Sequence, residues 1–133
     1  MTQDRNSGAA ANRWGRATAR QIASEIGASM KSRASNEALL NGKNVVIKCA
    51  APATDSVGVT YKMLETLDAI IGAFQLDDGS FELWSLSPEQ FESAMRKTRS
   101  RGPSAGKVAI VRRSIFVSHG IHLGRVWINR SLV

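Results

Sequence analysis

The sequence feature that most constrains the fold is the pair Asn41-Gly42, which lies inside the stretch 35–50. A two-residue hairpin turn needs positive φ at both central positions, and asparagine and glycine tolerate that conformation best. Apolar residues continue on both sides of the pair. The sequence therefore predicts two antiparallel strands, 36–40 and 44–50, that turn at Asn41-Gly42.

Lys48 is the unusual residue of the second predicted strand, which is otherwise mainly apolar and β-branched. A continuous apolar run is typical of a strand buried on both faces. A buried ammonium group requires an anion or water, because leaving it without a partner costs free energy. Two interpretations follow: the anion is a neighbouring carboxylate of the protein, or it is the phosphate of a bound substrate.

Length and composition predict a single soluble domain with a hydrophobic core. The chain has 133 residues, of which 43% are hydrophobic, and no apolar run is long enough to cross a bilayer, so we expect no membrane partner. Residues 1–12 lack the apolar segment of a signal peptide and are expected to form a flexible arm before a domain at 13–133. The single cysteine, Cys49, excludes an internal disulfide and suits a reducing cytoplasm.

Charge is segregated along the chain, whose formal net charge is +7. The segment 51–92 contains eight acidic residues and a single basic one, Lys62, whereas residues 93–133 contain nine basic residues and no acid. Clustered lysine and arginine bind polyanions by releasing counterions from phosphates. We therefore expect a nucleic-acid-binding face, with a plain solvated surface as the alternative. The residues predicted to form this face are Arg96, Arg99, Arg101, Lys107, Arg112 and Arg113.

Hydrophobic periodicity and turn residues predict the other elements. The expected helices cover 14–31, or less if Gly27 ends the first one early, 57–67 and 87–97. The expected strands cover 69–75, 81–86, 107–112 and 123–128, with 114–117 as a further candidate. Residues 98–106 are expected to form a basic loop. The aromatic residues Trp84, Phe116 and Trp127 are expected in the core.

This order of elements, with a lysine in the second strand of the hairpin, resembles the restriction-endonuclease-like superfamily, the PD-(D/E)xK nucleases. The likeness covers about residues 20–92 and includes the segments 68–74 and 81–91. The resemblance implies a single α/β domain, restriction-endonuclease-like, with a mixed sheet flanked by helices. It also implies a protein that binds or cleaves nucleic acid, with DNA ahead of RNA.

The resemblance further implies a metal-dependent site. In this family two acids and a lysine on the hairpin, often with a glutamate from the first helix, hold Mg²⁺ against a phosphate. By position, Lys48 matches the lysine, Glu37 the first carboxylate and Glu25 the helix glutamate, so Lys48, Glu37 and Glu25 are the catalytic candidates and Glu25 and Glu37 the metal ligands. The second acid would fall at Val46, which cannot bind a metal.

Because Val46 occupies the position of the second acid, two alternatives remain for the function of the chain. Either Asp55 or Asp68 supplies the missing ligand of a DNA endonuclease, or the chain keeps the fold and binds nucleic acid without cleaving it. The competing class is a noncatalytic binding or assembly module, for example a homodimer, in which Lys48 forms an ion pair with Glu25 or Glu37. The glycine-rich segment 102–107 departs from the phosphate-binding loop pattern, and His119 and His122 lack a neighbouring acid in the sequence, so neither predicts a nucleotide or metal site.

Overall fold

A computed structural model of the chain describes residues 5–32, 35–97 and 108–128. The first element is helix α1 (Arg5–Ile26), which begins inside the segment that was expected to be a flexible arm. The helix ends before Gly27, whose φ of 79° is unfavourable for residues with a side chain. In the described residues no helix is long and apolar enough to cross a membrane.

The main sheet is six-stranded and mixed, with the order β1-β2-β3-β5-β6-β9. Its strands are β1 (Ser29–Met30), β2 (Glu37–Leu40), β3 (Lys43–Ala50), β5 (Ala69–Gln75), β6 (Phe81–Leu86) and β9 (Ile121–Val126). Among the described strands of this sheet, only the central pair β3–β5 is parallel. The connection between these two strands contains β4 and α2, the crossover that a parallel pair requires.

The predicted hairpin is confirmed. Strands β2 and β3 pair in antiparallel register from Glu37 opposite Val46 to Leu40 opposite Lys43. Asn41 and Gly42 form the turn with φ values of 54° and 78°. A local sequence signal therefore fixed the register of the strand that carries Lys48, because the turn type sets the pairing of the flanking strands.

A second, three-stranded sheet has the order β4-β8-β7. It contains β4 (Ser56–Thr60), β7 (Arg96–Lys97) and β8 (Val108–Arg112). The short helices are α2 (Tyr61–Leu64), α3 (Pro88–Ala94) and α4 (Arg113–His119). Helix α3 begins with the predicted capping box, in which Ser87 and Gln90 exchange hydrogen bonds.

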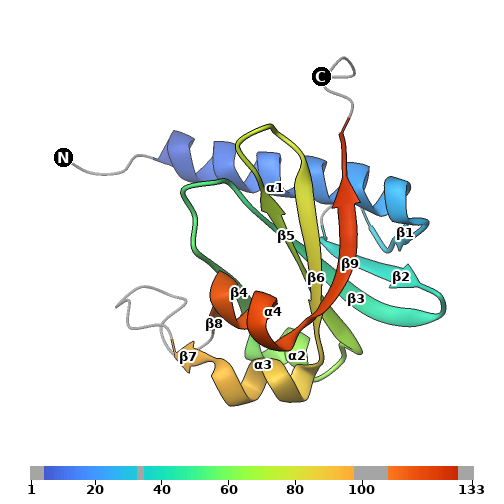
Figure 1. Ribbon diagram of the computed structural model, residues 1–133, viewed down its shortest axis with the longest axis vertical. Helices are drawn as coiled ribbons and strands as arrows, with labels where there is room; N and C mark the ends of the chain where they lie inside the picture. The colour runs from blue at the N-terminus through green and yellow to red at the C-terminus, as the bar shows by residue number, and fades with distance from the viewer. Residues whose placement is uncertain (1–4, 33–34, 98–107, 129–133) are drawn as a thin grey trace.

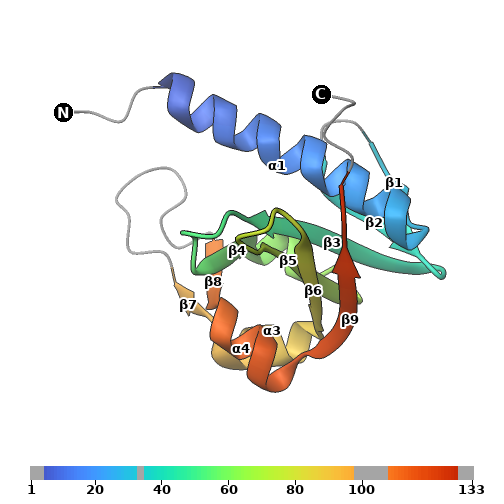
Figure 2. The ribbon, with the colours of Figure 1, turned by 45° about the horizontal axis from the view of Figure 1, so that its top comes forward.

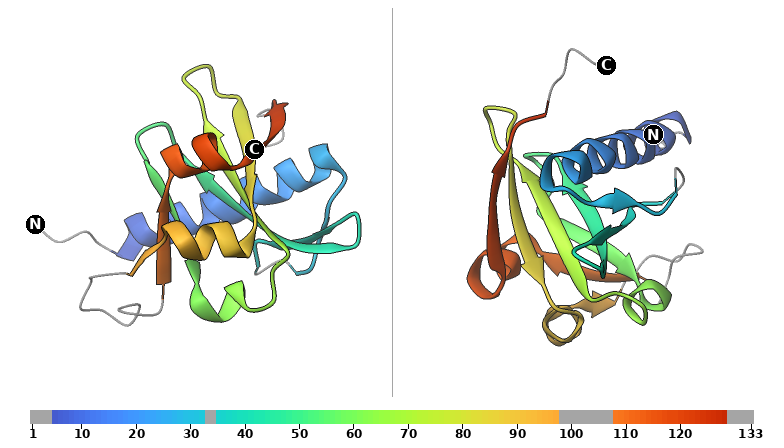
Figure 3. Two further views of the ribbon diagram at one scale, coloured as in Figure 1. Left: turned by 60° about the horizontal axis from the view of Figure 1, so that its bottom comes forward. Right: turned by 90° about the vertical axis from the view of Figure 1, so that its right-hand side faces the viewer.

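The two faces of the main sheet are covered differently, as the two turned views show (Figures 2 and 3). Helix α1 covers one face, which we call the α1 face; it contains Val45, Ile47, Ile71 and Leu83. The opposite face, the Lys48 face, contains Val46, Ile70 and Phe74 and packs against the second sheet and the helices α2, α3 and α4. Each of the two coverings buries one apolar cluster against the main sheet. Figure 1 shows α1 running across the strands and the short helices at the other end of the molecule.

The single α/β domain with a mixed sheet flanked by helices is confirmed, but several predicted elements differ. The helix predicted at 57–67 is wrong in its first part, because Val57 and Val59 alternate into the core as β4 and pair with β8. The candidate strand at 114–117 is also wrong, since those residues lie in α4, where Phe116 is buried. The helix predicted to reach 97 ends at Ala94, and Trp127 is 58% exposed instead of buried. The basic loop predicted at 98–106 lies outside the described residues.

Candidate nucleic-acid interface around Lys48

Lys48 projects from the face of the sheet opposite α1. Side chains alternate along a strand, and the neighbours two positions away, Val46 and Ala50, both belong to the cluster on that face. The residues beside Lys48 in the chain, Ile47 and Cys49, contact the core on the α1 face. The side chain of Lys48 therefore lies among the apolar residues of the Lys48 face.

Lys48 is half-buried, and burial lowers the pKa of its ammonium group from the ordinary value of 10.5. Within the described part of the chain, no carboxylate oxygen lies within 4.0 Å of this group. The ion pair with Glu25 or Glu37, which one interpretation of the sequence required, is therefore absent from these residues. A partly desolvated cation without a carboxylate partner remains able to bind an anion from outside the protein.

The strand next to Lys48, β5, carries a glycine and an aromatic ring on the same face of the sheet. On β5 the residue paired with Lys48 is Gly72. A Cβ atom at position 72 would lie 2.7 Å from Cε2 of Phe74 and 3.0 Å from Cε1 of Phe116, so the glycine allows the Phe74 ring to cover the strand. The guanidinium carbon of Arg113 lies 5.2 Å from the centre of the Phe74 ring. Arg113 therefore lies over a ring of β5, the strand that pairs with β3 at Lys48.

Glu37 lies on the same face as Lys48. It is directly opposite Val46, so Lys48 occupies the diagonal position two residues further along β3. Diagonal positions on paired strands are about 7–8 Å apart, which agrees with the absence of an ion pair. The Ser35 hydroxyl accepts a hydrogen bond from the Glu37 backbone at 2.9 Å and lies 3.4 Å from its carboxylate. The structure therefore brings Glu37 and Lys48 to one surface without joining them.

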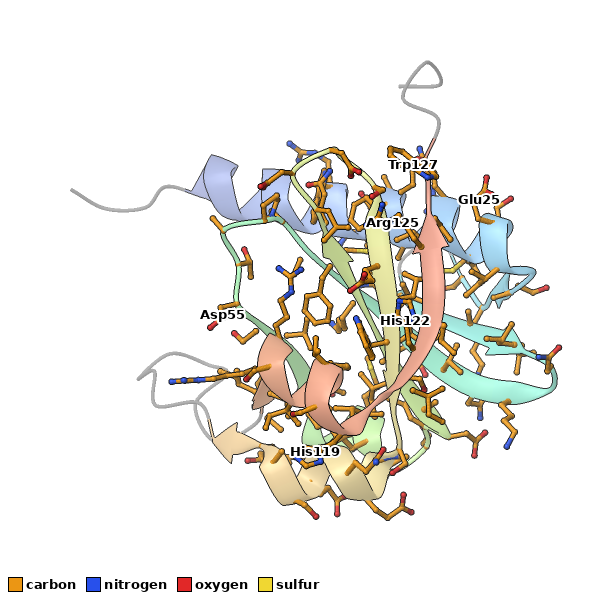
Figure 4. The ribbon with its side chains drawn as sticks, viewed as in Figure 1. Glu25, Asp55, His119, His122, Arg125 and Trp127 are labelled. Carbon is orange, nitrogen blue, oxygen red and sulfur yellow. The ribbon has the colours of Figure 1, made fainter. Side chains whose placement is uncertain are left out.

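The other acids proposed for the site lie elsewhere. Glu25 is exposed near the end of α1 (Figure 4). Helix α1 packs on the face of the sheet opposite Lys48. Asp68 accepts a hydrogen bond from the Asn44 backbone at 2.8 Å and so joins the start of β5 to β3, four residues before Lys48. The Asp55 side chain is exposed, and its backbone carbonyl accepts a hydrogen bond from the Arg113 backbone.

These placements do not assemble the metal site implied by the family resemblance. Among residues 5–32, 35–97 and 108–128, no three histidine, cysteine, aspartate or glutamate side chains are arranged to hold a metal ion. Valine occupies position 46, between Glu37 and Lys48 on this face. The described donor groups therefore do not fit Mg²⁺, which prefers several oxygen ligands in octahedral geometry.

Two of the predicted basic residues have described side chains. Arg112 is exposed at the end of β8, and Arg113, half-buried, begins α4 above Phe74. Arg96 lies on β7 at the position opposite Ile110, on the strand that carries Arg112. Arg99, Arg101 and Lys107 lie outside the described residues.

A polar cluster on β6 and β9 was missed by the sequence analysis. The Trp84 indole donates a hydrogen bond to Glu82 at 3.1 Å, and Nε2 of His122 lies 3.8 Å from the same carboxylate. The Trp84 and His122 rings are 4.5 Å apart between centres. The acid that His122 lacked in the sequence is therefore supplied across two strands, and only the pairing of β6 with β9 reveals it.

Comparisons with solved structures find similar chains, whereas no protein-family model and no curated protein matches this chain. A solved structure of the Holliday junction resolvase Hjc from the archaeal hyperthermophile Archaeoglobus fulgidus is similar, with a TM-score of 0.44 and 11% sequence identity. The match covers 82% of this chain and 91% of the resolvase chain. Similarity at this level does not indicate the activity of this chain.

Proposed function

We propose that this chain is a nucleic-acid-binding protein of nuclease-like fold, and that Lys48 contacts a backbone phosphate. One observation carries the proposal: Lys48 is half-buried on an apolar face, yet no carboxylate within the described residues lies within 4.0 Å of it. A protein retains such a cation at a cost, because burial disfavours its charged form. A phosphate oxygen would supply the missing negative charge.

The charge distribution favours a polyanion over a small phosphate compound. Residues 93–133 contain nine basic residues and no acid. Of those whose side chains are described, Arg112 and Arg113 lie at the junction of β8 and α4, whereas Arg125, on β9, lies near Asp78. Arginine binds phosphate oxygens with a planar fork of donors. Several separated cations gain affinity together only from a ligand with several phosphates. DNA comes ahead of RNA solely because of the family resemblance, and the cytoplasmic location stays a prediction from the single cysteine.

The proposal is tested by comparing two lysines of the same strand. We would measure binding of two labelled duplexes of unrelated sequence by fluorescence anisotropy at low salt, for wild type, Lys48→Met and Lys43→Met. Lys43 is exposed at the start of β3 and is the matched control. Loss of a charge-assisted hydrogen bond costs about 1.5–3 kcal/mol, so Lys48→Met should weaken binding to both duplexes about 10-fold or more.

Lys43→Met should change both affinities less than about threefold, because an exposed cation contributes little. Equal effects of the two substitutions would contradict a special role for Lys48. No binding by the wild-type protein at low salt would contradict the proposed function as a whole.

A metal-dependent DNA endonuclease is the second candidate, favoured by the placement of Glu37 and Lys48 on one face of adjacent strands. The described residues offer no Mg²⁺ site, so we expect no cleavage of plasmid or single-stranded DNA with Mg²⁺ or Mn²⁺. Cleavage by the wild type that is lost in both Lys48→Ala and Glu37→Gln would favour the endonuclease. Cleavage that survives both changes would place a nuclease site elsewhere in the chain.

A further inference from the structure

Exposed apolar side chains concentrate at one edge of the main sheet. Of the six large apolar residues that are exposed in the described chain, four belong to α4, β9 or the residue after β9. We call these four the β9 edge: they are Val117 (47% exposed), Ile121 (69%), Leu123 (44%) and Trp127 (58%). Large apolar groups gathered in one place on a surface are typical of an interaction site.

The two outer strands of the sheet differ in how they meet solvent. Strand β1 is only two residues long, and the exposed Lys31 follows it directly, two features that discourage the addition of another strand. Strand β9 has six residues, and in the described structure β6 is its only neighbour in the sheet. The backbone groups on the far side of β9 are therefore available to another strand (Figure 1).

The exposed side chains of β9 point to both faces of the sheet. Ile121 lies opposite Ser85, which has the same orientation as Leu83 on the α1 face. Trp127 follows Val126, which packs on the α1 face, so alternation directs Trp127 toward the Lys48 face. A partner that covered only one face would leave either Ile121 or Trp127 in water. A strand lying alongside β9 can contact both sets.

The charges beside this edge are already paired within the chain. His122 lies 3.8 Å from Glu82, and Arg125 lies 3.8 Å from Asp78, so both basic side chains of β9 have an acid from β6 or from the turn before it. Figure 4 labels His122 and Arg125 along β9. A polyanion would find little unpaired positive charge here. Two copies of the same edge could approach without strong repulsion between like charges.

We propose that β9 is the contact surface for a second copy of this chain, packed edge to edge around a two-fold axis. An antiparallel strand edge is complementary to itself, as a two-fold interface requires. The bulge at Leu123, where Gly124 has φ of 118°, prevents a regular ladder along all six residues. The apolar side chains of the β9 edge therefore carry the contact, together with the regular residues on either side of the bulge. This inference does not depend on nucleic-acid binding.

The test is the oligomeric state of the full chain and two matched variants. We would measure molar mass by light scattering after size exclusion and by sedimentation, over a range of protein concentrations. Leu123→Lys introduces a charge at the β9 edge, and Leu39→Lys does the same on β2, where the leucine is also 44% exposed. The wild type and Leu39→Lys should be dimers of about twice the 14.4 kDa chain mass. Leu123→Lys should be a monomer.

Three results would overturn the proposal. A wild type that is monomeric at every concentration, or dimers for both variants, would show that the β9 edge does not join two copies. In hydrogen exchange on the wild type, the β9 amides should become more protected as concentration rises, which keeps the proposal testable if Leu123→Lys fails to fold. Protection that appears only when a DNA duplex is added to a monomer would assign the edge to nucleic acid instead.

Discussion

The two faces of the main sheet share the same strands but differ in chemistry. The α1 face is filled by aliphatic and aromatic residues of α1 and the strands, including Ile22, Val45 and Ile47. The Lys48 face has an equally apolar centre, but it also carries Lys48 and Glu82. The difference is sharpest at two consecutive residues, since Cys49 contacts the α1 face and Lys48 projects the other way.

Burial acts on both of these neighbours but has different consequences. It raises the pKa of the Cys49 thiol to about 12, so the residue stays neutral and behaves as a small apolar group. Burial instead lowers the pKa of the Lys48 ammonium group. Unlike the Cys49 thiol, this group is charged in its ordinary form, so its burial costs free energy. The comparison teaches that packing accounts for the buried residues of the α1 face, whereas the Lys48 face carries a half-buried charge that packing does not explain.

The largest expected effect is on the α1 face. Ile47 is fully buried, so Ile47→Ala should lower the free energy of unfolding by about 2–5 kcal/mol, through lost apolar contact and the cavity left behind. Urea denaturation followed by circular dichroism measures this change. The adjacent substitution Lys48→Met should leave stability unchanged or raise it, because it removes a desolvated charge. Equal destabilisation by the two changes would mean that both faces are structural, and the comparison would fail.

A smaller effect is expected from filling the space beside Lys48. A methyl group at Gly72 would collide with the Phe74 and Phe116 rings, so Gly72→Ala should cost about 1–3 kcal/mol of unfolding free energy. Gly15 in α1 is the control, because no heavy atom apart from its chain neighbours and the nearby helix backbone lies within 4 Å of the position a Cβ would take. Gly15→Ala should stabilise the protein by about 0.5–1 kcal/mol. A Gly72→Ala variant as stable as the wild type would show that the Phe74 ring is not held over the strand.

The smallest expected effect is a pH dependence of the free energy of unfolding that is caused by Lys48. Because the folded state lowers its pKa, the unfolded chain binds more protons between that lowered value and about 10.5, and stability rises with pH across this window. The stability gained by Lys48→Met should therefore be greatest at neutral pH and shrink as pH rises toward 10.5. Urea denaturation of both proteins over this range measures the difference. An advantage that grows with pH would contradict the assigned direction.

The sequence predicted what short-range chemistry determines. The turn at Asn41-Gly42 and the cap at Ser87 each depend on residues within a few positions, and both are confirmed. Strand β4 was missed because its partner β8 begins at Val108, about fifty positions later in the chain. Propensity over 57–67 could not reveal that pairing, since tertiary contacts decide strand formation for short segments.

The candidate site was predicted only in part for the same reason. The sequence identified Lys48 as unusual from the residues around it, and the structure confirms that it is half-buried among apolar groups. Whether an acid lay beside it depended on the positions of Glu25 and Glu37 in space, which no local pattern contains. The Glu82–His122 contact likewise depends on the pairing of β6 with β9.

The most direct test of the central claim is the salt dependence of nucleic-acid binding for the wild type and Lys48→Met. The logarithm of the binding constant falls linearly with the logarithm of salt concentration, with a slope set by the number of phosphates contacted. If Lys48 contacts a phosphate, the slope for Lys48→Met should be smaller by about 1 than that of the wild type, equally for unrelated sequences. Identical slopes and affinities for the two proteins would contradict the claim.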